Sequence, residues 1–147
     1  MNATENFQII HRYLARQHVL TLCTATGDDI WCANCFYVFN ADEIAFWFMT
    51  ELHTRHGEMM QVNPQVAGTI AGQIRHIAQI KGIQFKGEVI RLEGEKDKVA
   101  RARYCRRFPV AIAVKTPIWQ LNLNEIKMTD NTLGFGKKNL LAAIKLS

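Results

Sequence analysis

The sequence lacks the features that mark membrane-spanning, secreted and multidomain proteins. No apolar run approaches the roughly 20 residues that a helix needs to cross a bilayer. The stretch from Met1 to Gln17 has no basic start, clean apolar core or small-residue cleavage site, so we expect no secretory signal. There is no internal repeat, low-complexity tract or Pro/Gly/Ser-rich linker, so we expect residues 1–147 to form one domain. Together these absences favour a cytoplasmic protein with no membrane partner.

Cysteine is sparse, although two of the cysteines form a motif that suggests redox chemistry. The four are Cys23, Cys32, Cys35 and Cys105, and in a reducing compartment we expect thiols. The run "IWCANCF" contains Trp-Cys-x-x-Cys, the spelling of a thioredoxin-type site, which places its first cysteine at a helix start. Here the chain continues as a strand, in which Cys32 and Cys35 face opposite sides. We interpret both as small buried side chains of a core strand. We expect no metal site, because no second ligand pair has a matching spacing.

The bulk composition is that of a globular domain with an excess of positive charge. The chain has 147 residues, of which 48% are hydrophobic and 21% are charged. A domain of this size buries roughly 68–70% of its unfolded surface, so it folds without a disulfide or a metal. The formal net charge is +5. That excess favours an anionic partner, which leaves open a phosphate-bearing cofactor, an anionic substrate and nucleic acid.

The hydrophobic pattern predicts short strands with a few helices between them. Apolar residues at helical spacing predict helices over residues 5–16, from Thr54 to Pro64, and over 95–107. Strand formers bounded by turns predict six strands, at 18–25, 30–39, 44–49, 65–72, 80–92 and 118–128. Turns at 26–29 and 40–43 join the first three into an antiparallel meander. A change of apolar phase between Val89 and Ile90, after Gly87, predicts a bulge or a bend there, and the tail after Gly136 is open between helix and strand.

This pattern predicts a mainly β protein with peripheral helices. Six short strands close together in the sequence are typical of a small antiparallel barrel. The second and third strands carry more aromatic residues than one small core needs: Phe36, Tyr37, Phe39, Phe46, Trp47 and Phe48. That surplus favours an interface with a second copy, although a packed core explains the same pattern.

The segment after the third strand carries the strongest chemical signal. Thr54, Arg55 and His56 stand at the expected start of a helix. Backbone N–H groups and the helix dipole favour an anion there, and Arg55 can hold two phosphate oxygens at once. Alternatively, Thr54 only caps the helix and Arg55 is solvated. The residues alone leave both readings open.

The order of these motifs resembles the pyridoxamine 5'-phosphate oxidase-like family of FMN-binding split barrels. The likeness runs from the first helix to Lys138 and includes "HVLTLCTA", "IWCANCFYVF", "IAFWFMT", "HTRHGEMMQVNPQVAGTI" and "IKGIQFKGEVIRLEGE". The ending "DNTLGFGKK" points to the YhbP-like branch of that family. The resemblance implies a six-stranded antiparallel split β-barrel, a homodimer, and FMN bound at the subunit interface.

The resemblance also implies which residues contact the cofactor. In the family a Ser/Thr-Arg-Lys run after the third strand holds the flavin phosphate, the second strand lies along the ring, and an Arg-Gln-Val run precedes the glycine of the long strand. The corresponding residues here are Thr50, Thr54, Arg55, His56, Asn34, Cys35, Phe36 and Lys81. His56 stands where the family has lysine, which makes phosphate binding weaker and pH-dependent, and Gly82 replaces a polar side chain at the ring. The tail "NLLAAIKLS" departs from the aromatic and basic ending expected of the barrel.

Three functions follow as hypotheses. The first is a dimeric FMN-dependent oxidoreductase of an unknown small substrate, in which the catalytic residues are unknown and only residue type suggests His53 or Lys81 as an acid or base. The second is haem binding, for which the histidines are His11, His18, His53, His56 and His76. The third is a non-catalytic binding protein. The basic helix over 95–107 could meet nucleic acid, but we expect a solvated face whose charges complement the helix dipole.

Overall fold

The computed structural model describes residues 3–133 and 140–145. The helices are α1 (Ala3–Arg16), α2 (Arg55–Val62) and α3 (Gly94–Arg107). The strands are β1 (Val19–Thr26), β2 (Asp29–Asn40), β3 (Ala45–Met49), β4 (Gln65–Ile70), β5 (Lys81–Arg91), β6 (Ile118–Asp130) and β7 (Leu140–Lys145). Short 3-10 turns are η1 (Ile77–Gln79), η2 (Pro109–Ala113) and η3 (Asn131–Leu133). The predicted helices and the six predicted strands are all present, with ends shifted by one or a few residues.

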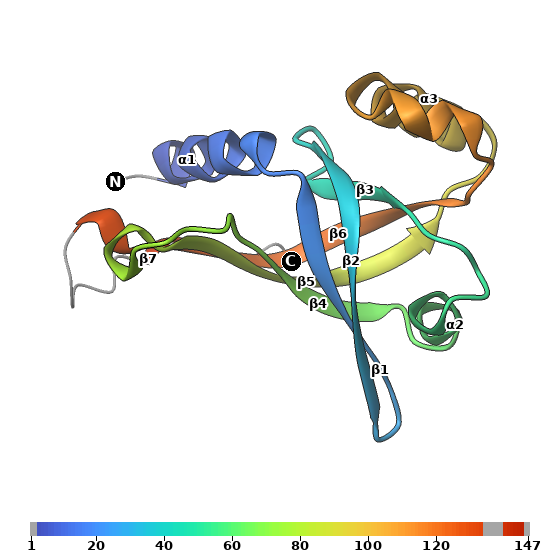
Figure 1. Ribbon diagram of the computed structural model, residues 1–147, viewed down its shortest axis with the longest axis horizontal. Coiled ribbons are helices and arrows are strands. Elements are labelled where there is room, and N and C mark those ends of the chain that lie inside the picture. The colour runs from blue at the N-terminus through green and yellow to red at the C-terminus, as the bar shows by residue number, and fades with distance from the viewer. Residues whose placement is uncertain (1–2, 134–139, 146–147) are drawn as a thin grey trace.

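Six antiparallel strands close into a ring, as predicted. Their order is β3-β2-β1-β4-β5-β6, and β3 pairs with β6 to complete the circle (Figure 1). Strand β6 is long enough to serve two partners on one edge, because residues 118–122 pair with β3 and residues 125–129 pair with β7. The described part of the tail is therefore a strand, β7, which settles the choice left open by the sequence.

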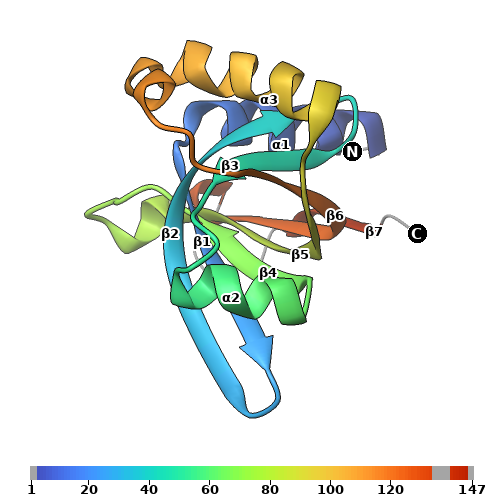
Figure 2. The same cartoon turned by 90° about the vertical axis from the view of Figure 1, so that its right-hand side faces the viewer.

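Most of the aromatic side chains of β2 and β3 are buried within the subunit. Alternation places Phe46 and Phe48 in the barrel interior, and Trp47 on the opposite face, where α3 covers it. Figure 2 shows α3 above β3, and α2 across the other end of the barrel. Of the aromatic residues named for a possible interface, Phe36 alone is well exposed, at 53%. The other five are buried within the subunit, so their number does not require an interface.

The strand register corrects the predicted bulge. Lys86 pairs with Glu125, but the next residue, Gly87, pairs with Leu123. The extra residue is therefore Asn124 on β6, and the irregularity lies three residues before the expected place. Gly87 is needed there because a Cβ at this position would lie 2.0 Å from the carbonyl oxygen of Asn122. The apolar phase change after Val89 has a different origin, since β5 leaves the interior and Leu92 packs under α3.

We predict that Gly87→Ala lowers the free energy of unfolding by about 1–3 kcal/mol, because backbone must move to admit the methyl group. Gly82→Ala on the same strand is the matched control, since its Cβ would meet nothing closer than Ile70 O at 3.6 Å. That control should be neutral or stabilising, because glycine in a strand costs roughly 0.5–1 kcal/mol relative to alanine. Urea unfolding of both variants measures the difference, and equal losses would contradict the close contact.

Candidate functional site

Helix α2 begins directly after β3 and closes one end of the barrel. Thr54 is its N-cap, as predicted: the hydroxyl accepts from Gly57 N–H at 3.0 Å and donates to the Glu51 carbonyl at 2.9 Å. Met60 on the same helix is buried in the barrel core, which fixes the helix against the barrel. The start of α2 is thus held rigidly beside the end of β3.

A histidine and two threonines form a compact polar group at this helix start. The Nε2 atom of His56 lies 2.5 Å from Thr50 Oγ1 and 3.4 Å from Thr54 Oγ1. Thr50 is 7% exposed, and its carbonyl accepts from Trp119 Nε1 at 3.2 Å. Burial lowers the pKa of His56 below its usual 6.5, because removing water penalises the charged ring. His56 is therefore neutral at neutral pH.

Arg55 points away from that group, toward the β1–β2 hairpin. Its Nη2 donates to Asp29 Oδ1 at 2.9 Å, and its guanidinium carbon lies 3.9 Å from the centre of the Trp31 ring. The side chains of Arg55 and Asp29 are each half exposed. Trp31 thus supports the guanidinium while Asp29 engages one of its five N–H groups. The positive charge sits on the surface at the start of α2.

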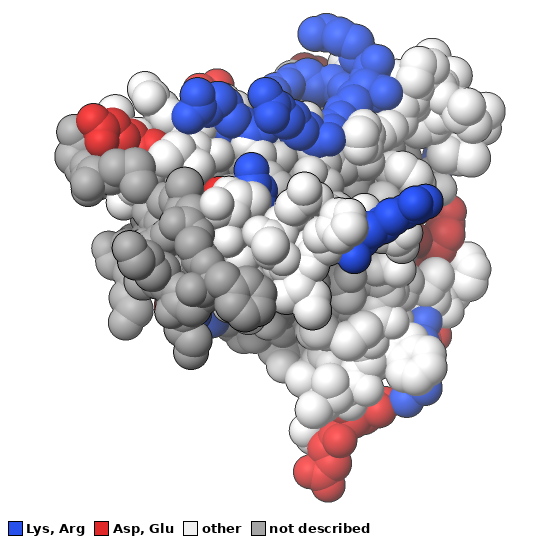
Figure 3. Space-filling model, turned by 60° about the vertical axis from the view of Figure 1, so that its left-hand side comes forward, with Lys and Arg blue, Asp and Glu red and all other residues white. Residues whose placement is uncertain are grey.

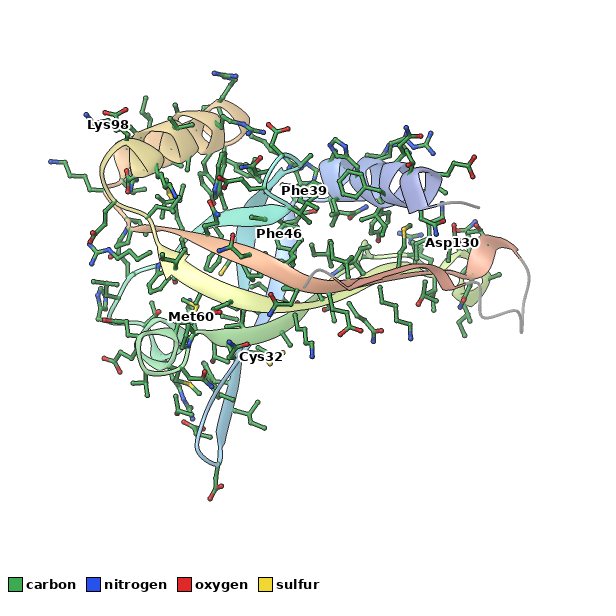
Figure 4. The ribbon with its side chains drawn as sticks, turned by 180° about the vertical axis from the view of Figure 1, so that it is seen from behind. Cys32, Phe39, Phe46, Met60, Lys98 and Asp130 are labelled. Carbon is green, nitrogen blue, oxygen red and sulfur yellow. The ribbon has the colours of Figure 1, made fainter. Side chains whose placement is uncertain are left out.

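The remaining predicted contacts do not gather around α2. Asn34 and Phe36 are exposed on the outer face of β2, where Thr21 Oγ1 donates to Asn34 Oδ1 at 2.8 Å. The Cys35 side chain faces the barrel core. Lys81 forms a 3.8 Å ion pair with Asp130, and Figure 4 shows Asp130 at the opposite end of the barrel from Met60 on α2.

The cysteine motif behaves as a strand, with one correction. Cys32 and Cys35 point to opposite faces, as expected, and Cys35 is buried. Cys32, however, is exposed, so the interpretation of both as buried residues is wrong. The hairpin continues beyond the part of β2 that α3 covers, which leaves the outer face at Cys32 open.

An apolar pocket that the sequence analysis did not predict lies beside β2, at Phe36. It has a volume of about 460 Å³ and is formed by Phe36 together with the end of α3 and η2. Its lining is Phe36, Tyr104, Arg107, Phe108, Pro109, Val110 and Ala111. A volume of this size suits a small ligand or part of a cofactor. The uninterrupted apolar run after Pro109 is the sequence feature that could have indicated this pocket.

The basic face of the molecule is partly committed to the fold. Figure 3 shows Lys and Arg gathered at the top of the view, at the level of α1 and α3. On α3, Arg101 makes two hydrogen bonds to Asp97, at 3.0 and 3.2 Å. Arg103 lies over the Trp47 ring, and Arg107 donates to the Tyr37 carbonyl. Three of the arginines of α3 thus contact other residues of the same subunit. None of the described helices is long and apolar enough to cross a membrane.

Solved structures with this architecture define the class of protein. A haem-binding protein of Mycobacterium smegmatis matches with a TM-score of 0.76 at 19% identity, over 99% of this chain and 58% of that one. The haem storage protein HutZ of Vibrio cholerae has a TM-score of 0.69 at 17% identity, covering 79% and 88% of the two chains. An FAD-binding protein of Mesorhizobium loti has a TM-score of 0.69 at 12% identity, covering 87% and 94%. The fold is that of the pyridoxamine 5'-phosphate oxidase-like split barrels.

Sequence relatives place the chain more narrowly. It is 99% identical over 138 residues to a UPF0306 protein of Photorhabdus laumondii, which covers 94% of this chain and 96% of the relative. A UPF0306 protein of Yersinia enterocolitica is 60% identical over 138 residues, covering 94% of both. A scan against protein-family profiles finds no match. The chain belongs to the UPF0306 family.

The depressed pKa of His56 predicts how stability depends on pH. Below about pH 6.5 the unfolded chain takes up a proton at this residue, whereas the folded protein stays neutral to lower pH. The unfolded state then binds more protons, so the free energy of unfolding should fall as pH drops from about 7.5 to about 5.5. We expect His56→Gln to flatten this slope. His76→Gln, at an exposed position, is the control and should leave the slope unchanged. Urea unfolding at several pH values gives the free energy of unfolding of the wild type and of both variants.

Proposed function

We propose that this protein binds a phosphate-bearing flavin of the FMN type, as a homodimer, and uses it to reduce a small substrate. The observation that carries the proposal is the half-exposed guanidinium of Arg55, which lies over the Trp31 ring at the N-terminus of α2. Bound FMN would supply the hydride or electron transfer. The chain's own residues would bind it, orient it and exclude water from it.

The start of α2 has the donors that a flavin phosphate requires. The amides of Arg55 and His56 belong to the first helical turn, which has no carbonyl partners within the helix. The helix dipole favours negative charge at the same place. Because the pKa of His56 is lowered, the imidazole brings no charge at neutral pH. The proposed phosphate site therefore depends on Arg55 for its positive charge, where the resembling family uses an arginine and a lysine.

The outer part of β2 offers a surface for the flavin ring. Strand β3 pairs only with residues 37–40 of β2, so residues 29–36 have no described strand on that edge. Tyr37 N–H donates to the carbonyl of His18, just before β1, so the even-numbered residues of β2 direct their backbone N–H and C=O groups to the open edge. The Tyr104 hydroxyl reaches the Phe36 carbonyl there at 3.2 Å. The N–H and C=O of Asn34 point to the same edge, which runs between Arg55 and the apolar pocket.

The first test compares FMN with riboflavin, which differ by the phosphate. Arg55→Ala should weaken FMN binding about tenfold or more, because a charge-assisted hydrogen bond contributes roughly 1.5–3 kcal/mol. Riboflavin affinity should change little in that variant. Asp29→Asn should tighten FMN binding, since it removes a carboxylate that competes for Arg55. Quenching of flavin fluorescence during titration gives each dissociation constant.

Two controls make this test decisive. Arg75→Ala removes an exposed arginine elsewhere on the surface and should leave both affinities unchanged. Equal loss of FMN and riboflavin in Arg55→Ala would contradict the phosphate contact, and a wild-type protein that binds neither flavin would end the proposal.

Haem is the second candidate, because His18 borders the apolar pocket. His18 is exposed, and its ring centre lies 6.5 Å from that of Phe108, which lines the pocket. An exposed imidazole beside an apolar pocket is the arrangement that an axial haem ligand needs. A Soret band on haemin addition, lost in His18→Ala, together with no flavin binding, would favour this function over the first.

An unusually apolar surface beside the pocket supports the proposed homodimer. The apolar patch consists of Phe36 and Val110, which line the pocket, and of Ile112 and Val114, which line the neighbouring hollow against α3; Ala111 borders both. Val110 and Ile112 are 88% and 80% exposed. Large exposed aliphatic side chains that gather in this way mark interaction sites. A second copy seated on the patch would also cover the pocket and bring its own residues to the open edge of β2.

Ile112→Lys should raise the monomer–dimer dissociation constant about tenfold or more, because it places a charge in the buried interface. Val62→Lys is the matched control: Val62 is also highly exposed, at 77%, but lies at the end of α2 outside the apolar patch. Sedimentation equilibrium of the wild type and both variants measures the constant. An unchanged dimer in Ile112→Lys would show that this patch is not the interface.

A further inference from the structure

Two thiols face each other on the outer face of the β1–β2 hairpin. Cys23 and Cys32 are directly opposite in the strand register, and their Sγ atoms lie 3.1 Å apart. Both are free thiols; Cys32 is exposed and Cys23 is partly buried. Figure 4 labels Cys32 on the hairpin that projects from the barrel. The proposed cofactor contacts do not include this pair.

The register places the pair on the kind of rung where side chains approach most closely. Tyr37 N–H donates to the His18 carbonyl at 3.0 Å, which marks 18 and 37 as a hydrogen-bonded pair. Rungs alternate along an antiparallel ladder, so Cys23 and Cys32, five rungs further on, form a non-hydrogen-bonded pair. Their Cα atoms are then about 4.5 Å apart, at the short end of the roughly 4.4–6.8 Å that a disulfide spans. A disulfide can therefore form there without moving the strands.

The fold does not need such a bond. A disulfide stabilises a protein mainly by closing a loop in the unfolded chain, and this loop is short. The turn at Gly27, where φ is +57°, and the ladder of β1 with β2 already hold the hairpin together. A cross-link that the folded hairpin does not require is suited to reversible chemistry.

We propose that Cys23 and Cys32 are a reversible redox pair, which a small disulfide such as oxidised glutathione converts into a cross-strand disulfide. The thiolate of exposed Cys32 attacks a glutathione sulfur, breaks the glutathione S–S bond and releases one glutathione thiol. The Cys23 sulfur then attacks Cys32 Sγ and releases the second glutathione thiol. Two protein thiols are oxidised, one glutathione disulfide is reduced, and both protons leave with the glutathiones. The pair works independently of flavin binding.

The environment of the two sulfurs sets the order of attack. The hydrogen bond with Cys32, followed by burial, raises the pKa of Cys23 to about 11, so Cys23 is protonated in the reduced pair. The first attack therefore falls to Cys32, which is also the more accessible sulfur. Once Cys32 carries glutathione, its hydrogen bond to Cys23 no longer holds that proton. Cys23 is then the resolving thiol.

The test equilibrates the full-length protein with excess oxidised glutathione, blocks the remaining thiols by alkylation, and weighs the intact protein. We expect the wild type to lose two of its four alkylatable thiols and to gain no glutathione. Cleavage before Asp28 and Asp29 separates Cys23 from the peptide that carries both Cys32 and Cys35, so a linked pair of peptides shows that Cys23 is one of the bonded residues. The serine variants then identify the other. Dithiothreitol should restore all four thiols.

Serine variants separate the pair from the other cysteines. Cys23→Ser should stop at a stable glutathione adduct on Cys32, and Cys32→Ser should form no disulfide. Cys105→Ser, on α3, is the control and should still form the cross-strand bond. Retention of all four thiols in the wild type, a lasting glutathione adduct on it, or a bond through Cys35 would each overturn the proposal.

Discussion

The pairing of β3 with β6 is the contact on which the other features of the molecule depend. It closes the ring of strands, and its five rungs place alternate residues of β3 in two different cores. The pairing continues one step beyond the strand, where Thr50 N–H donates to the Pro117 carbonyl at 3.2 Å. Trp119, the partner of Phe48, then reaches the Thr50 carbonyl with its indole N–H. Thr50 is therefore fixed by the barrel itself, and the position of His56 and of the start of α2 follows from it.

This arrangement assigns different tasks to neighbouring residues at the start of α2. His56 is turned inward, hydrogen-bonded and neutral, whereas Arg55 is turned outward, supported by an aromatic ring and charged. Burying a lysine at position 56 would cost more free energy than burying the neutral histidine, because the charge would lose water without gaining a carboxylate partner. The substitution that distinguishes this chain from the resembling family is thus consistent with its local packing. It moves the electrostatic part of the proposed anion site onto Arg55 alone.

Much of the fold could be predicted from the sequence, because local signals agreed with tertiary structure. The cap at Thr54, the meander and the six-strand ring all follow from periodicity and turn residues. The partners of Arg55 could not be predicted in this way, since Asp29 lies 26 positions away and meets it only after the hairpin has folded over α2. The bulge was misplaced because the extra residue, Asn124, is on β6, and a phase change within β5 carries no information about its partner strand. The resemblance named Lys81 as a cofactor contact, and within one subunit its partner Asp130 lies at the opposite end of the barrel from α2.

The cysteines show how a motif can direct attention to the wrong pair. The Trp-Cys-x-x-Cys motif suggests that Cys32 and Cys35 act as a pair, but in a strand these two residues lie on opposite faces. The two-residue turn at Gly27 and Asp28 instead fixes the register of the hairpin: residues at equal distances before and after the turn lie opposite each other. Cys23 is therefore opposite Cys32. The turn was recognised in the sequence, so this register was available there. The same alternation divides β2 by function: Trp31 faces α2 and supports Arg55, while the next residue, Cys32, presents its thiol on the outer face. Neighbouring residues of one strand therefore serve the proposed anion site and the proposed redox pair on opposite faces, without direct contact between their side chains.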